Sequence, residues 1–92
     1  MEYRSSRGFE KILRRLPPNE KMEVQRHVDA FVRAFEARII PLGMGLKKLR
    51  HSVWELRVNL ALRILFRWEK QTVTLLFIGN HNEVRQFLKH YV

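Results

Sequence analysis

The spacing of apolar side chains along the chain changes near its middle. From residue 9 to residue 39 they recur every three to four positions, which is the period of an amphipathic α-helix. From residue 53 to residue 79 they alternate with polar side chains or run together, as in β-strands. Helical spacing returns after residue 79. The pattern therefore predicts helices, then a sheet, then a final helix.

Prolines and glycines divide the first half into two predicted helices. Pro17 and Pro18 end the first, because proline lacks an amide hydrogen and restricts the residue before it. Asn19 is a suitable cap for the second helix, which we expect to end before Pro41. The apolar stripes comprise Phe9, Ile12, Leu13 and Leu16 in the first helix, and Val24, Val28, Phe31, Val32, Phe35 and Ile39 in the second.

Three runs of strand character follow, at residues 53–58, 62–68 and 72–79. The connections between them are short enough for hairpins, so the sheet should be antiparallel. The start of the chain, "EYRSS", is a candidate edge strand, and a last helix should begin at Asn80 or Asn82. We therefore expect an α+β domain with two N-terminal helices, an antiparallel sheet of three to four strands and a C-terminal helix.

Composition narrows the class of protein. The 92 residues suffice for a single domain, residues 1–92, and 46% apolar residues supply its core. The absence of cysteine excludes disulfides, thiolate chemistry and zinc fingers, and no pattern of metal ligands or of cofactor binding is present, so we expect neither metal nor cofactor. No segment resembles a signal peptide or a membrane span, so a soluble cytoplasmic protein is expected.

The charge points to an acidic partner. Eighteen Lys and Arg residues against nine Asp and Glu residues give a formal net charge of +9. Such an excess favours binding to a nucleic acid or an acidic protein over an anionic membrane. A basic composition that only aids solubility is the alternative.

Three residues are expected to meet at one end of the sheet. If the first hairpin turns about Leu60, Arg57 lies across from Arg63, and Gly79 then emerges beside Arg63, with His81 close by. Arginine binds phosphate oxygens through its planar fork, and an imidazole exchanges protons near neutral pH. This grouping suggests metal-independent cleavage of RNA, in which a 2′-hydroxyl of the RNA itself is the nucleophile. The alternatives are arginines on a solvated strand face and a His81 that serves the start of the helix.

A family resemblance appears at these residues. The segment "LKKLRHSVWELRVNLALRILFRWEKQTVTLLFIGNHNEV", residues 46–84, resembles the C-terminal half of the RelE/ParE superfamily of bacterial type II toxins. The shared features are a lysine-containing stretch, a Trp-Glu-Leu-Arg strand, a second strand with an early arginine, an apolar third strand and a Gly-x-His element. The resemblance implies a small α+β toxin neutralised by an acidic antitoxin. It also implies cleavage of messenger RNA on the ribosome, or, in ParE-like members, inhibition of DNA gyrase.

The resemblance assigns roles by position. It makes Arg57, Arg63 and His81 the catalytic residues, with His81 as general acid or base. Glu55 stands where RelE has a lysine, and Arg85 stands where several relatives have an aromatic residue. The cations expected to guide RNA are Lys47, Lys48, Arg67 and Arg85. A gyrase inhibitor without nuclease activity and an inert domain that binds nucleic acid or antitoxin are the alternatives.

Overall fold

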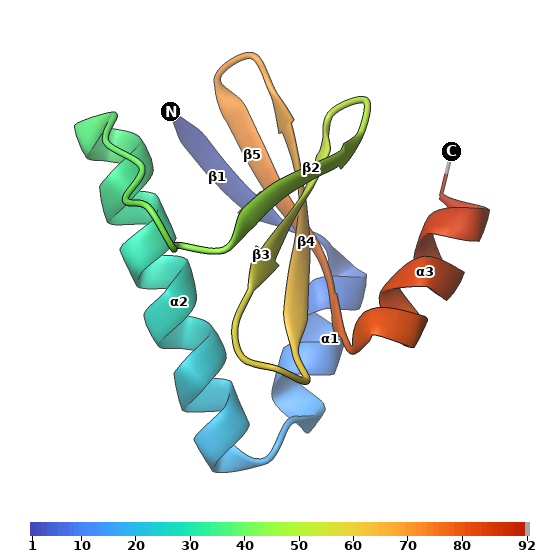
Figure 1. The fold of residues 1–92 in the computed structure, drawn as a ribbon. Coiled ribbons are helices and arrows are strands. Elements are labelled where there is room, and N and C mark those ends of the chain that lie inside the picture. The colour runs from blue at the N-terminus through green and yellow to red at the C-terminus, as the bar shows by residue number, and fades with distance from the viewer. Residues whose placement is uncertain (92) are drawn as a thin grey trace.

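The computed structural model describes residues 1–91, which form three helices and five strands. The order of elements confirms the predicted α+β class (Figure 1). Their bounds are β1 Glu2–Ser5, α1 Arg7–Arg15, α2 Pro18–Ala37, β2 Leu46–Arg50, β3 Val53–Arg57, β4 Arg63–Glu69, β5 Thr72–Gly79 and α3 His81–His90.

The sheet is larger than predicted and is not wholly antiparallel. Its strand order is β1-β5-β4-β3-β2, and β1 pairs with β5 in parallel. The candidate edge strand at residues 2–5 is thus confirmed as an edge strand, while β2 was not predicted. Both edge strands are short and largely exposed, so neither carries the strong apolar alternation of an inner strand. The three predicted strands form the β3–β4–β5 meander, with hairpin connections as expected.

Helices cover both faces of the sheet. In Figure 1, α1 and α2 lie on one side and α3 on the other. The larger core lies under α1 and α2 and contains fully buried phenylalanines, with the ring centroids of Phe31 and Phe66 4.6 Å apart. A smaller core of Leu65, Leu76 and Val84 lies under α3. Within residues 1–91, no helix has both the length and the apolar character needed to cross a membrane.

The second helix begins one residue before the predicted cap. Pro18 is its first residue and Pro17 precedes it without a side-chain cap, so Asn19 lies inside the first turn. Proline suits this place, because its fixed φ matches the helix and its missing amide hydrogen has no partner there in any case. The helix ends at Ala37, and the capping residue Arg38 adopts the left-handed conformation with φ 59°.

Candidate functional site

The strand register brings the predicted catalytic residues to one end of the sheet. Arg57 on β3 lies opposite Arg63 on β4, and Arg63 lies opposite Gly79 at the end of β5. This is the register predicted from the hairpin lengths. Because α3 begins two residues after Gly79, the first helical residue, His81, is held next to both arginines.

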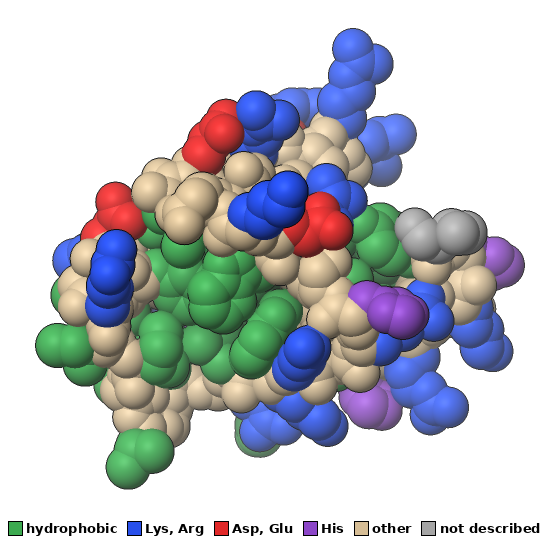
Figure 2. Space-filling model, turned by 90° about the horizontal axis from the view of Figure 1, so that it is seen from above, with side chains coloured by type: hydrophobic (Ala, Val, Ile, Leu, Met, Phe, Trp, Pro, Cys, Tyr) green, Lys and Arg blue, Asp and Glu red, His purple; other side chains and the backbone are tan. Residues whose placement is uncertain are grey.

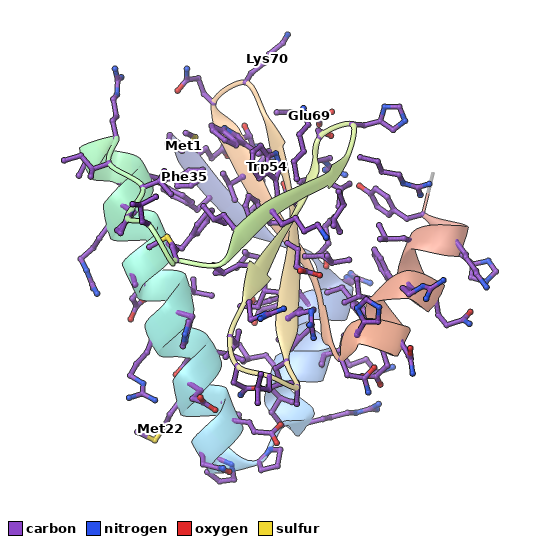
Figure 3. All side chains as sticks on the ribbon, in the orientation of Figure 1. Met1, Met22, Phe35, Trp54, Glu69 and Lys70 are labelled. Carbon is purple, nitrogen blue, oxygen red and sulfur yellow. The ribbon has the colours of Figure 1, made fainter. Side chains whose placement is uncertain are left out.

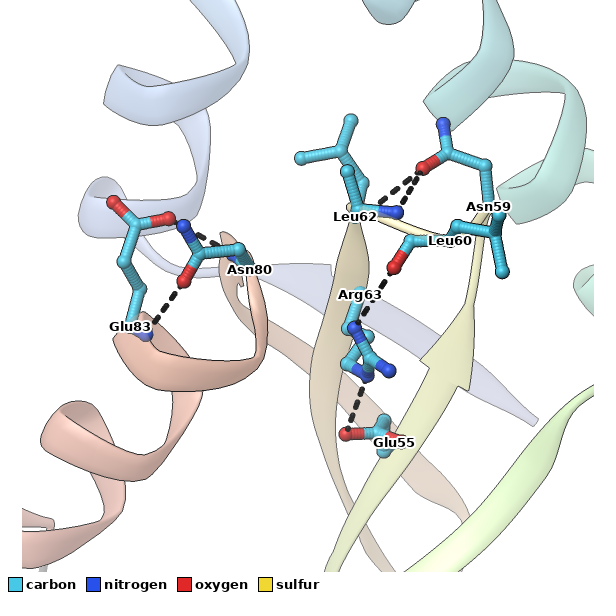
Figure 4. Close-up of polar contacts among 8 residues, drawn as sticks. Glu55, Asn59, Leu60, Leu62, Arg63, Asn80 and Glu83 are labelled. Atoms are coloured by element: carbon cyan, nitrogen blue, oxygen red, sulfur yellow. Dashed lines mark hydrogen bonds and ion pairs between the residues drawn. The ribbon is translucent and has the colours of Figure 1, made fainter.

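The start of α3 is capped by other residues than His81. The Asn80 side chain accepts a hydrogen bond from the Glu83 amide at 2.8 Å, and the Glu83 carboxylate accepts one from the Asn80 amide at 2.8 Å (Figure 4). This reciprocal pair is a capping box. His81 is exposed, and its ring makes no hydrogen bond within residues 1–91. The imidazole is therefore available to a ligand.

Gly79 allows this tight junction between β5 and α3. A Cβ atom at this position would lie 2.7 Å from Cε2 of Phe77 and 2.9 Å from Cβ of Glu83. Both distances are shorter than van der Waals contact, so a side chain here would push the first turn of α3 away from the strand. The glycine of the Gly-x-His element thus fixes where His81 sits.

Charged side chains from β2, β3, β4 and α3 line a cavity of about 190 Å³. Small-molecule pockets usually measure about 300–1,000 Å³, so this cavity suits a single phosphate group and its neighbouring sugar rather than a whole nucleotide. Four of its side chains are cations and one is a carboxylate. The lining residues are Lys47, Leu49, Glu55, Arg57, Arg63, His81, Val84, Arg85 and Leu88.

Sequence reasoning did not assign Glu55 to the site. Glu55 is only 9% exposed. Its Oε1 lies 3.5 Å from Nε of Arg63, and both side chains are almost buried (Figure 4). A buried carboxylate needs such a partner, because desolvation of an unpaired charge is costly. The available signal was the alternation of β3, which puts Glu55 on the same face as Arg57.

Two predicted RNA-binding residues lie outside the cavity. Lys48 pairs with Trp54 in the β2–β3 ladder and follows Lys47 directly, so it faces the opposite side of the sheet. Arg67 lies further along β4, where its Nε is 3.2 Å from Oε1 of Glu69 and its guanidinium donates to the Tyr91 hydroxyl. It lines a separate hollow of about 500 Å³.

The far end of α3 is fastened to β2. The guanidinium of Arg50 donates hydrogen bonds to the carbonyl oxygens of Leu88 and Tyr91, the latter at 2.7 Å. The last turn of a helix leaves carbonyls without an i+4 amide, and here the Leu88 oxygen accepts from both the Tyr91 amide and Arg50. Arg50 at one end and the Asn80 capping box at the other therefore hold the helix that carries His81 and Arg85.

The electrostatics of the cavity favour an anion with several oxygens. Lys47, Arg57 and Arg85 are exposed cations around the ion pair of Arg63 with Glu55. Cations held this close repel each other unless an anion lies between them. Arginine forks match phosphate oxygens, and the cavity also holds a carboxylate and an imidazole for proton transfer.

Comparison with solved structures identifies the fold. No sequence model of a protein family matches the chain, and no curated protein sequence matches it. The toxin complex RelB-RelE from Methanococcus jannaschii matches with a TM-score of 0.69 at 14% identity, covering 91% of this chain and 96% of that one. RelBE2 from Mycobacterium tuberculosis, also a toxin-antitoxin complex, matches with a TM-score of 0.62 at 21% identity over 87% and 96% of the two chains.

A further match is to a structure named as a ParE toxin. The YoeB/ParE toxin from Agrobacterium tumefaciens gives a TM-score of 0.65 at 13% identity, covering 88% of this chain and 99% of that one. Each match covers 87% or more of this chain, and so extends well beyond the segment of residues 46–84 that carries the resemblance. They confirm the fold implied by residues 46–84, which is that of the RelE/ParE toxins.

Proposed function

We propose that this chain, which has the fold of the RelE/ParE toxins, is the toxin of a type II toxin-antitoxin pair that cuts messenger RNA on the ribosome. The cavity at the start of α3 is its active site. The observation that carries the proposal is the meeting of Arg57, Arg63 and His81 around one small cavity that also contains Glu55. A surface that only bound a protein would gain nothing from a free imidazole beside a buried carboxylate.

The arginines bind the phosphate at the point of cleavage. Attack by the neighbouring 2′-hydroxyl makes the phosphorus five-coordinate and increases the negative charge on its oxygens. Arg57 and Arg63 stabilise that charge, since preorganised cations in a partly desolvated site interact strongly with a developing oxyanion. Glu55 keeps Arg63 oriented toward the cavity before RNA binds. The positive charge comes from arginine side chains, so the reaction requires no catalytic metal ion.

Glu55 and His81 handle the protons. The Glu55 carboxylate accepts the proton of the 2′-hydroxyl as the bond from O2′ to phosphorus forms. The His81 imidazolium donates a proton to O5′ as the bond from phosphorus to O5′ breaks. The products are a 2′,3′-cyclic phosphate and a 5′-hydroxyl. Glu55→Gln retains an acceptor for Arg63 but loses the proton acceptor, so we expect the cleavage rate to fall by about 10²-fold or more.

The remaining cations guide the RNA. Lys47 and Arg85 line the cavity, so they contact the phosphates next to the one that is cut. Arg67 extends the basic surface along the same face of the sheet toward the C-terminal end of α3. Lys48 lies on the other face and is assigned no contact with the cleaved segment.

An acidic antitoxin is the expected protein partner. The net charge of +9 supports it, and similar folds are found in complexes of toxin with antitoxin. Both partners and the messenger RNA would meet in the cytoplasm.

End mapping in a reconstituted translation reaction tests the proposal. The purified chain is added to ribosomes translating a defined message, and new RNA ends are located by primer extension. We expect new ends within ribosome-occupied codons, and a loss of about 10²–10⁴-fold in their rate of formation for His81→Ala. His90→Ala is the matched control, because it removes an exposed histidine from the other end of the same helix.

The alternative outcomes separate the related functions. An intact message together with loss of gyrase supercoiling activity would assign the chain to the ParE-like branch. An intact message without effect on gyrase would leave a domain that only binds. Equal cleavage by the wild-type chain and His81→Ala would contradict the proposed site while retaining the activity.

A further inference from the structure

An apolar surface lies on the face of the sheet away from the cavity. Trp54 and Trp68 lie side by side there, with ring centroids 5.6 Å apart, and Phe35 lies 4.7 Å from Trp68. Ile40 and Met1 complete this apolar surface, which we call the tryptophan patch. Figure 3 shows Met1, Phe35 and Trp54 together at the end of the molecule that carries the C-terminus of α2.

The tryptophan patch is hollowed and open. A hollow of about 450 Å³ is lined by Phe35, Ile40, Trp68 and Met1, together with polar groups at its border. Ile40 is 47% exposed and Met1 is 40% exposed. Figure 2 shows this end as a continuous area of apolar side chains bordered by charged ones. A contiguous apolar area of this kind marks an interaction site more often than scattered apolar residues do.

The charged side chains that line the hollow are both cations. Arg38 and Lys70 line the hollow, and neither forms an ion pair within the part of the chain that the structure describes. Glu2 pairs with Arg4 and Glu69 pairs with Arg67, while Glu36 accepts a hydrogen bond from the Tyr3 hydroxyl and keeps its charge outside the lining of the hollow. The hollow therefore offers apolar contacts and two unpaired cations.

We propose that the tryptophan patch binds an amphipathic acidic polypeptide, which inserts large apolar side chains into the hollow and pairs carboxylates with Arg38 and Lys70. A second copy of this chain fits less well, because two bodies of charge +9 repel each other and bring further cations to the border. Identifying this polypeptide as the antitoxin rests on the proposed function. The existence of the binding surface does not depend on that function.

The position of the patch makes binding separable from cleavage. Trp54 and Glu55 are consecutive residues of β3, so their side chains point to opposite faces of the sheet. A polypeptide on the tryptophan patch therefore leaves the cavity open unless it also extends around the edge of the sheet. Variants of the patch should lose the partner and retain RNA cleavage.

The chain provides its own reporter for this binding. Its only two tryptophans are Trp54 and Trp68, so a ligand on the patch changes the intrinsic fluorescence of the protein. The probe is obtained by selecting a random peptide library, displayed on phage, for binding to the full chain in the absence of RNA. We expect the selected peptides to combine carboxylates with large apolar residues and to alter the tryptophan emission.

Three variants make the result specific. Ile40→Asp, and Arg38→Glu combined with Lys70→Glu, should each weaken peptide binding at least about tenfold, which corresponds to about 1.4 kcal/mol. Met22→Asp is the matched control, because Met22 is 64% exposed and lies at the other end of α2 (Figure 3). It should bind the peptides as the wild-type chain does. Circular dichroism verifies that each variant is folded.

Several results would overturn the proposal. Selection of no peptide, selection of peptides without excess carboxylates, or equal affinity for wild-type and Ile40→Asp would each do so. Sedimentation of the wild-type chain as a dimer that Ile40→Asp dissociates would assign the patch to self-association instead. These measurements involve no RNA, so their result does not depend on whether the chain cleaves RNA.

Discussion

Nε of Arg63 lies 3.5 Å from Oε1 of Glu55, and both side chains are almost buried beside the cavity. Arg57, directly across the ladder from Arg63, is exposed instead. The two arginines of the site thus have different structural roles. Arg63 balances a buried carboxylate, whereas Arg57 forms no ion pair within residues 1–91.

This difference predicts opposite effects on stability. Arg63→Ala leaves Glu55 buried without its partner, so the free energy of unfolding should fall by about 3 kcal/mol. Arg57→Ala removes an exposed side chain and should change it by less than about 0.5 kcal/mol. Both should lose cleavage activity. Urea denaturation measures the stabilities, and equal stability of the two variants would contradict the assigned role of the ion pair.

Replacement of His81 should change the pH dependence of cleavage. A general acid works only while it is protonated, so an acid role for His81 predicts that the wild-type cleavage rate falls as the pH is raised. His81→Gln should be slower by about 10²–10⁴-fold and should lack this fall. Single-turnover cleavage rates provide the test. A variant profile with the wild-type shape would remove His81 from proton transfer.

Gly79→Ala should impair cleavage without replacing any reacting group. The added methyl would overlap Phe77 and Glu83, so the first turn of α3 must shift and carry His81 with it. Gly8→Ala is the control, since its new Cβ would lie 3.8 Å or more from its neighbours. We expect loss of activity only for Gly79→Ala, and a wild-type rate for this variant would show that the junction tolerates a side chain.

Two adjacent lysines should differ in RNA binding. Lys47 lines the cavity and Lys48 faces the other side of the sheet. Each phosphate contact with single-stranded RNA adds about 0.7 to the slope of log affinity against log salt. Lys47→Ala should therefore reduce the slope by about that amount, and Lys48→Ala should not. Fluorescence anisotropy on the inactive His81→Ala background measures both, and equal slopes would argue against the proposed path of the RNA.

The sequence predicted those features that follow from local periodicity. Alternating side chains located β3 and β4, and short hairpins set the register that pairs Arg57 with Arg63. The strand β2 was missed because two of its five residues are exposed lysines and it lies at an edge. Had β2 been recognised as a strand, the alternation of side chains along it would have placed Lys47 and Lys48 on opposite faces of the sheet.

Other features depend on contacts between distant residues. The parallel pairing of β1 with β5 joins the two ends of the sequence, and no local pattern specifies it. The burial of Glu55 depends on packing under α3, and the engagement of Arg67 depends on Tyr91 at the end of that helix. Sequence reasoning therefore predicted the four cations that line the cavity. It did not predict that Glu55 is buried among them, or that Arg67 is bound to Tyr91.

The most direct test of the central claim uses two messages in the same translation reaction. One is unmodified, and the other carries a single 2′-deoxynucleotide immediately 5′ of the mapped cleavage point. The account predicts that the wild-type chain cuts the unmodified message there and leaves the modified one intact at that position, because the attacking 2′-hydroxyl is missing. Cleavage of both messages at that point, or of neither, would contradict it.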